Sequence, residues 1–63
     1  MIFNIFKKTE NDDRELIQTC EPESFIANNE TNNLTLYFPD KPMKYKFDNM
    51  IVEYGKGMAT VIL

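Results

Sequence analysis

The sequence predicts a mainly β fold, in which a four-stranded antiparallel meander is covered by an N-terminal strand or by short helical segments. The second half of the chain contains four short runs rich in β-branched, aromatic and methionine residues, at about residues 34–38, 43–47, 50–54 and 58–63. The links between these runs are four, two and three residues long, and they consist of turn-forming residues. Those loop lengths place the apolar residues of all four runs on one face of the meander.

The loop lengths also predict which residues lie opposite each other. A tight hairpin at the two-residue link places Lys44 opposite Glu53, and the four-residue link places Tyr37 opposite Lys44 and Thr35 opposite Lys46. The inward face expected from the three registers comprises Leu34, Leu36, Phe38, Met43, Tyr45, Phe47, Met50, Val52, Tyr54, Met58, Thr60 and Ile62. Thr60 is the plainly polar member of this set.

The first half of the chain is less regular. Residues 15–27 fit either short strands or a helix, because Asp12 and Glu15 resemble a helix capping box whereas the alternation from Leu16 to Cys20 suits a strand. The apolar segment at residues 1–8 can pair with the edge of the last strand and close a small barrel, or it can leave that edge to a second copy or another protein.

Length and composition predict a single small domain spanning residues 1–63 with a marginal core. One cysteine and no histidine exclude an internal disulfide and a structural zinc site, so we expect no metal and no cofactor. Oligomerisation or binding to another protein is then the leading source of extra stability. A lone cysteine and the lack of a secretory pattern predict a cytoplasmic location.

The second face of the meander predicts a protein interface. Near the last two strands this face presents Ile51, Ala59, Val61 and Leu63, and the edge at residues 58–63 lacks the charge or proline that edge strands generally carry. We therefore expect a non-enzymatic protein-binding module, self-associating as a homodimer or higher homo-oligomer, that regulates or inhibits a larger protein by masking its surface. A tiny chain rich in Asn, Lys and Ile is typical of genes carried by phages and other mobile elements.

Two other functions stay open from the sequence. Tyr37, Lys41, Lys44 and Lys46 could bind single-stranded nucleic acid, although a net charge of −3 argues against a general polyanion binder. Residues 1–8 could anchor the chain at a membrane surface. Enzymatic activity is not expected, because without histidine neither Cys20 nor Ser24 has the usual activating base.

Overall fold

The computed structural model describes residues 1–63, and all of its regular elements are β-strands. The strands are β1 (Ile2–Lys8), β2 (Arg14–Cys20), β3 (Ser24–Asn28), β4 (Asn33–Tyr37), β5 (Pro42–Lys46), β6 (Asn49–Glu53) and β7 (Met58–Ile62). The prediction of a mainly β protein is confirmed. Residues 15–27 belong to β2, to β3 and to the link at residues 21–23, and no helical segment covers either sheet.

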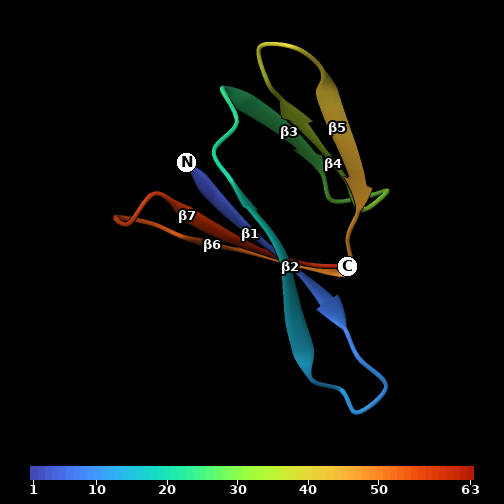
Figure 1. Ribbon diagram of the computed structural model, residues 1–63. Helices are drawn as coiled ribbons and strands as arrows, with labels where there is room; N and C mark the ends of the chain where they lie inside the picture. Colours follow the sequence, from blue (N-terminus) through green and yellow to red (C-terminus); the bar gives the residue numbers. More distant parts are fainter.

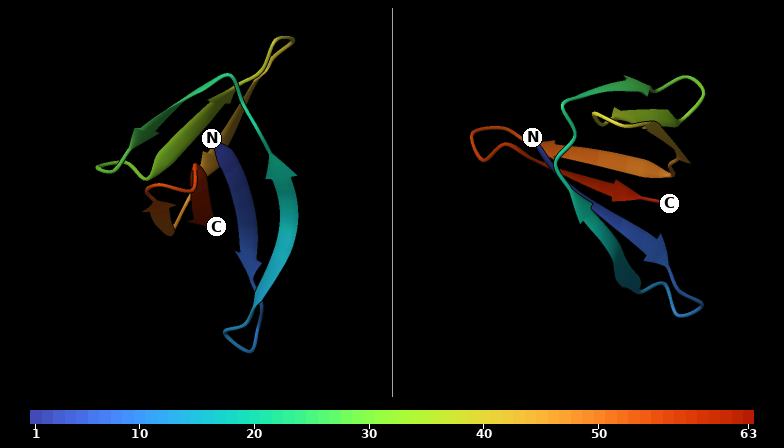
Figure 2. Two further views of the ribbon diagram at one scale, coloured as in Figure 1. Left: turned by 90° about the vertical axis from the view of Figure 1, so that its left-hand side faces the viewer. Right: turned by 45° about the horizontal axis from the view of Figure 1, so that its top comes forward.

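The strands form two sheets rather than one continuous meander. Sheet A has four strands in the order β2-β1-β7-β6, and sheet B has three strands in the order β3-β4-β5. The two sheets lie one above the other as two layers (Figures 1 and 2). Each sheet has a face that points towards the other, so the sheets can cover each other.

The first and last strands are neighbours at the centre of sheet A. β1 pairs in parallel with β7, from Ile2 opposite Met58 to Phe6 opposite Ile62, and it pairs on its other side with β2. The N-terminal segment therefore occupies the edge of residues 58–63, as one of the two sequence-based alternatives expected, but the strands form two separate sheets and not the small barrel of that alternative. β7 is an interior strand, and its backbone is not open to a partner.

The expected pairing of β5 with β6 is wrong. Lys44 and Glu53 lie in different sheets, because the chain crosses from sheet B to sheet A at Phe47 and Asp48. The Phe47 amide donates to the carbonyl of Asn32, and the Asp48 amide donates to the carbonyl of Ile62. The crossing buries the Phe47 side chain and places the β4–β5 and β6–β7 hairpins in different sheets, which can pack face to face. A single flat meander would leave one apolar face uncovered.

The β4–β5 hairpin exists, but its register differs from the expected one by two residues. Tyr37 lies opposite Pro42 and Thr35 lies opposite Lys44, because Phe38 enters the loop and its amide donates to the carbonyl of Lys41. A shift of two residues leaves the same side chains on each face.

The β6–β7 hairpin is shifted by one residue, which exchanges the two faces of β7. Glu53 lies opposite Met58, and the four residues 54–57 form the loop, in which Gly55 and Gly57 have φ values of 88° and 62°. This register points Ala59 and Val61 inwards and Thr60 outwards, contrary to the prediction. It removes the threonine hydroxyl from the core, where it would need a hydrogen-bond partner.

β1 and β2 form a long hairpin whose tip points away from sheet B (Figure 1). Asp12 has a φ of 61° in this turn, so Asp12 and Glu15 belong to a hairpin and not to a helix cap. A β-bulge in β2 leaves Ile17 without a partner in the register.

The core lies between the inner faces of the two sheets. Its buried members are Phe3, Ile5, Leu34, Leu36, Phe47, Ala59 and Val61. Phe3 of sheet A meets Phe25 of sheet B edge to face, with ring centroids 5.0 Å apart. The Tyr45 hydroxyl of sheet B donates to Gln18 of sheet A, so a polar contact also joins the layers.

Candidate functional site

The residues expected to form a protein interface are not on one exposed face. Ala59 and Val61 are fully buried in the core, and Leu63 is half-buried against it. Ile51 alone points outwards, with 46% of its surface exposed. The expected surface is absent because the β6–β7 register turns Ala59 and Val61 inwards and because β1 covers the edge of β7.

A different apolar surface lies on the outer face of sheet A, which points away from sheet B. The pleat alternates side chains, so the strand positions between the buried residues of sheet A point outwards. The outward apolar residues, here named the outer apolar face, are Ile2, Phe6, Leu16, Ile17, Ile51 and Met58. Ile62 is on the same side of the sheet by register, but only 2% of its surface is exposed. Of the five exposed isoleucine and leucine side chains in the protein, all except Ile26 belong to this face.

The strand register determines how the outer apolar face is arranged. Leu16 and Phe6 form one row across β2 and β1, and the buried Ile62 continues this row on β7. Ile2 and Met58 form another row near the opposite end of the same strands. Leu16 is 53% exposed, because the tip of the β1–β2 hairpin extends away from the rest of the molecule.

Polar groups lie between the two apolar rows. The Thr19 hydroxyl donates to Oδ1 of Asn4 at 3.0 Å, and Thr60 and Ile51 continue this row towards β6. Since these hydroxyl and amide groups are not buried in the core, they remain accessible to a binding partner. The outer apolar face thus combines aliphatic contact area with a short polar row that can orient a partner.

The sequence could not reveal this face, although it singled out Ile51. Ile2 and Phe6 join it only because β1 pairs with β7, which is more than fifty residues away in the chain. The alternation of Ile2, Asn4 and Phe6 with Phe3 and Ile5 was the available signal that residues 1–8 form a strand with two different faces.

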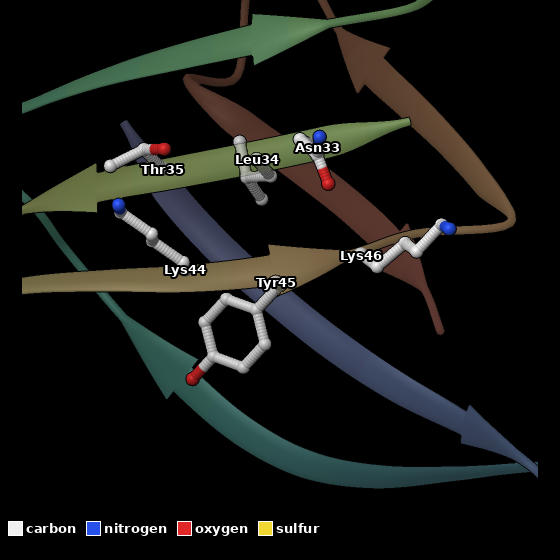
Figure 3. Close-up of a pocket in the computed structure, with 6 residues that line it drawn as sticks. All are labelled: Asn33, Leu34, Thr35, Lys44, Tyr45 and Lys46. Carbon is white, nitrogen blue, oxygen red and sulfur yellow. The ribbon is translucent and has the colours of Figure 1, made fainter. Parts of the chain in front are cut away.

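The residues expected to contact nucleic acid do come together. Tyr37, Lys44 and Lys46 point outwards from sheet B, and Lys41 lies in the loop that joins β4 to β5. Thr35, rather than Tyr37, is the direct neighbour of Lys44. A hollow of about 360 Å³ lies over β4 and β5 and is lined by Asn33, Leu34, Thr35, Lys44, Tyr45 and Lys46 (Figure 3).

The cysteine lies in an environment that favours the neutral thiol. Cys20 is half-buried at the end of β2, and desolvation raises its pKa. Desolvation also raises the pKa of Tyr45, with a smaller contribution from the charge of Cys20. Both shifts oppose formation of an anion, so this pair is poorly suited to thiolate nucleophilic chemistry.

The segment at residues 1–8 is largely engaged in the fold. It forms β1 with a neighbour on each side, and Phe3 and Ile5 are fully buried. The structure contains no helix that could span a lipid bilayer. No group of three or more histidine, cysteine, aspartate and glutamate side chains is arranged to hold a metal ion.

Comparison with protein families, curated proteins and solved structures finds no match for this chain. Function is therefore inferred from the outward faces of the two sheets.

Proposed function

We propose that the protein is a non-enzymatic protein-binding module that uses the outer apolar face of sheet A. The observation that carries this proposal is the concentration of exposed aliphatic side chains on one sheet face: Ile2, Leu16, Ile17 and Ile51 are there, beside the partly buried Phe6 and Met58. Scattered single apolar residues are normal on a protein surface, whereas several on one face indicate an interaction site.

The small size of the core supports the same proposal. Only nine of the 63 residues are buried. The accessible surface is 4613 Å², whereas a compact monomer of this mass exposes about 4,200 Å². Burial of the outer apolar face against a partner would add apolar contact that the isolated chain does not provide.

In this proposal the protein associates with itself and acts by covering a surface of a larger protein. A sheet face that is apolar on both sides of a polar row can pack against another sheet at about 10 Å. The face carries Arg14 and Lys8 at one end and Glu53 at the other, so charges of both signs border it. Such a border can specify orientation, while the aliphatic residues supply contact area.

The test compares three single variants of the full chain. Leu16→Lys and Ile51→Lys place a charge on the outer apolar face, whereas Tyr54→Lys places the same charge on a side chain that is 92% exposed in the β6–β7 loop. Sedimentation velocity at micromolar concentration measures self-association, and affinity capture from the host cell measures binding to another protein. Circular dichroism checks that each variant keeps the fold.

We expect the wild type and Tyr54→Lys to form oligomers and to capture the same partner, and the two face variants to lose both properties. A wild-type protein that is strictly monomeric and captures nothing would contradict the proposal. Capture that survives both face variants would place the interface elsewhere.

A further inference from the structure

The outer face of sheet B differs chemically from that of sheet A. By register, its outward strand residues are Ser24, Ile26, Asn28, Asn33, Thr35, Tyr37, Pro42, Lys44 and Lys46. This set contains two cations and no carboxylate, although the chain as a whole has a net charge of −3. Positive charge and hydrogen-bonding groups are therefore concentrated on one small face of an acidic protein.

The two lysines of this face are free of ion pairs. The ion pairs of the protein join Lys8 to Asp48 and Lys56 to Glu53, both outside sheet B. Lys44 and Lys46 are two residues apart on β5 and point to the same side, so their backbone positions are about 6.7 Å apart. Two unpaired ammonium groups with this spacing can contact successive phosphates of an extended strand.

An aromatic surface lies next to the lysines. Tyr37 is 38% exposed and is paired with Pro42, one step along the sheet from the pair formed by Thr35 and Lys44. A tyrosine ring beside a proline ring offers an apolar surface on which an unpaired base can stack. Ile26, which is 61% exposed beside Thr35, extends the apolar contact towards β3.

The hollow over β4 and β5 is lined by Lys44 and Lys46 and ends next to the pair formed by Tyr37 and Pro42. Asn33 and Thr35 contribute an amide and a hydroxyl, and Figure 3 shows the side chains of Thr35 and Lys44 close together between the strands. The same view shows the Tyr45 ring pointing away from them, towards β2. The hollow thus offers uncharged hydrogen-bonding groups beside a cation, which suits the sugar and base edges of a nucleotide.

We propose that the outer face of sheet B binds single-stranded nucleic acid, with a base stacked on Tyr37 and neighbouring phosphates held by Lys44 and Lys46. Lys41, in the loop that follows Tyr37, adds positive charge where the bound nucleic acid would leave the face. A paired duplex hides its base faces and cannot use the tyrosine, so the site selects a single strand. Because this site and the outer apolar face lie on different sheets, each proposal can fail without the other.

The experiment measures the fluorescence anisotropy of labelled single-stranded 12-mers of thymidine and of uridine as the full-length protein is added. Lys44→Glu combined with Lys46→Glu reverses the charge of the face, and Tyr37→Ala removes the stacking ring. A matched charge control combines Lys7→Glu with Lys56→Glu, and Tyr54→Ala is the matched control for the tyrosine. Circular dichroism checks each variant, and Gln replaces Glu at positions 44 and 46 if the double charge reversal does not fold.

We expect Tyr37→Ala to weaken binding by about 5- to 150-fold, which corresponds to the loss of one stacked base. The double variant of Lys44 and Lys46 should abolish measurable binding, while both controls stay within twofold of the wild type. Contact with two phosphates also predicts that wild-type affinity falls about sevenfold between 50 and 200 mM salt.

Three results would overturn the proposal. The first is no binding of either 12-mer at 100 μM protein in low salt. The second is an equal loss in the control variants, which would show that binding does not use this face. The third is binding of inorganic polyphosphate as tight as that of the 12-mers together with no effect of Tyr37→Ala, which would show simple adsorption of a polyanion.

Discussion

The inward position of Val61 can be tested by exchanging two neighbouring residues of equal shape. Val61 is fully buried in the core, opposite Met50 of β6 and beside Ile5 of β1. Thr60, the preceding residue, points to the outer face of sheet A. Val61→Thr and Thr60→Val each exchange one methyl group and one hydroxyl, and both residues are β-branched with similar preference for strands.

The expected effects differ because the two side chains lie on opposite faces. Val61→Thr places a hydroxyl in a core whose buried polar side-chain atoms are all hydrogen-bonded in the wild type, so it creates an unpaired group. Such a group costs about 1–3 kcal/mol. Thr60→Val changes a side chain at the surface and should alter the free energy of unfolding by about 0.5 kcal/mol or less.

This loss is large for so small a protein. A 63-residue domain has a free energy of unfolding of roughly 3–9 kcal/mol. A loss of about 2 kcal/mol lowers the melting temperature of a domain of this size by about 8–16 °C. The variant should therefore remain folded at 10 °C while it melts clearly below the wild type.

The assay is urea unfolding followed by circular dichroism. The slope of the free energy against urea should be the same in all three proteins, because the area exposed on unfolding is unchanged. The reasoning would be refuted if Val61→Thr cost less than about 0.5 kcal/mol while Thr60→Val stabilised the protein by a similar amount or more. That result would mean that Thr60 points inwards, in the register expected from a three-residue loop.

The remaining predictions concern the polar contact between the layers, the β6–β7 loop and the surface ion pair. The pKa values of Cys20 and Tyr45 are raised in the fold, from ordinary values of 9.0 and 10.0, so stability that is present below those values is lost as the pH rises above them. Urea unfolding at pH 8 to 11 should show this decline, and Tyr45→Phe should flatten its upper part; an unchanged decline would exclude Tyr45 as its source. Gly57→Ala forces an alanine to a φ of 62° and should destabilise the protein by about 1 kcal/mol in the same assay, although nothing lies within 4 Å to clash with the new Cβ. Lys8→Ala breaks an exposed ion pair with Asp48, and a melting curve should show a loss of at most about 1 kcal/mol that disappears in 1 M salt.

The strand segments could be predicted from the sequence because their signals are local. The positions of β4 to β7 follow from short apolar runs between turn residues, and each observed boundary lies within one residue of the expected one. The β4–β5 and β6–β7 hairpins were also expected, since short links join strands that can pair directly.

The pairing of strands could not be predicted as well, because it depends on distant contacts. The sequence Asp48-Asn49 is typical of a two-residue turn, yet the burial of Phe47 between the layers favours a crossing between sheets at this point. The register of β6 with β7 depends on whether Tyr54 ends a strand or opens a loop, and that single residue decides which face of β7 enters the core.

The candidate sites also differ in whether local or distant contacts form them. Tyr37, Lys44 and Lys46 could be grouped from the sequence because a single hairpin places them on one face, and a register error of two residues does not separate them. The outer apolar face could not, because its residues come from strands at both ends of the chain. Ile51 was correctly expected to point outwards, but its expected companions Ala59 and Val61 are part of the core.

The parallel pairing of β1 with β7 has a consequence for how the protein reaches its native state. Ile2 and Met58 are paired, so the central ladder of sheet A requires almost the whole sequence to be folded back before it can form. Closing so large a loop costs entropy that only later contacts offset, and domains dominated by such distant pairings fold in milliseconds to seconds. The local hairpins β1–β2 and β6–β7 and the three-stranded meander β3–β4–β5 can form early, and the docking of β1 against β7 is then the slow step of folding.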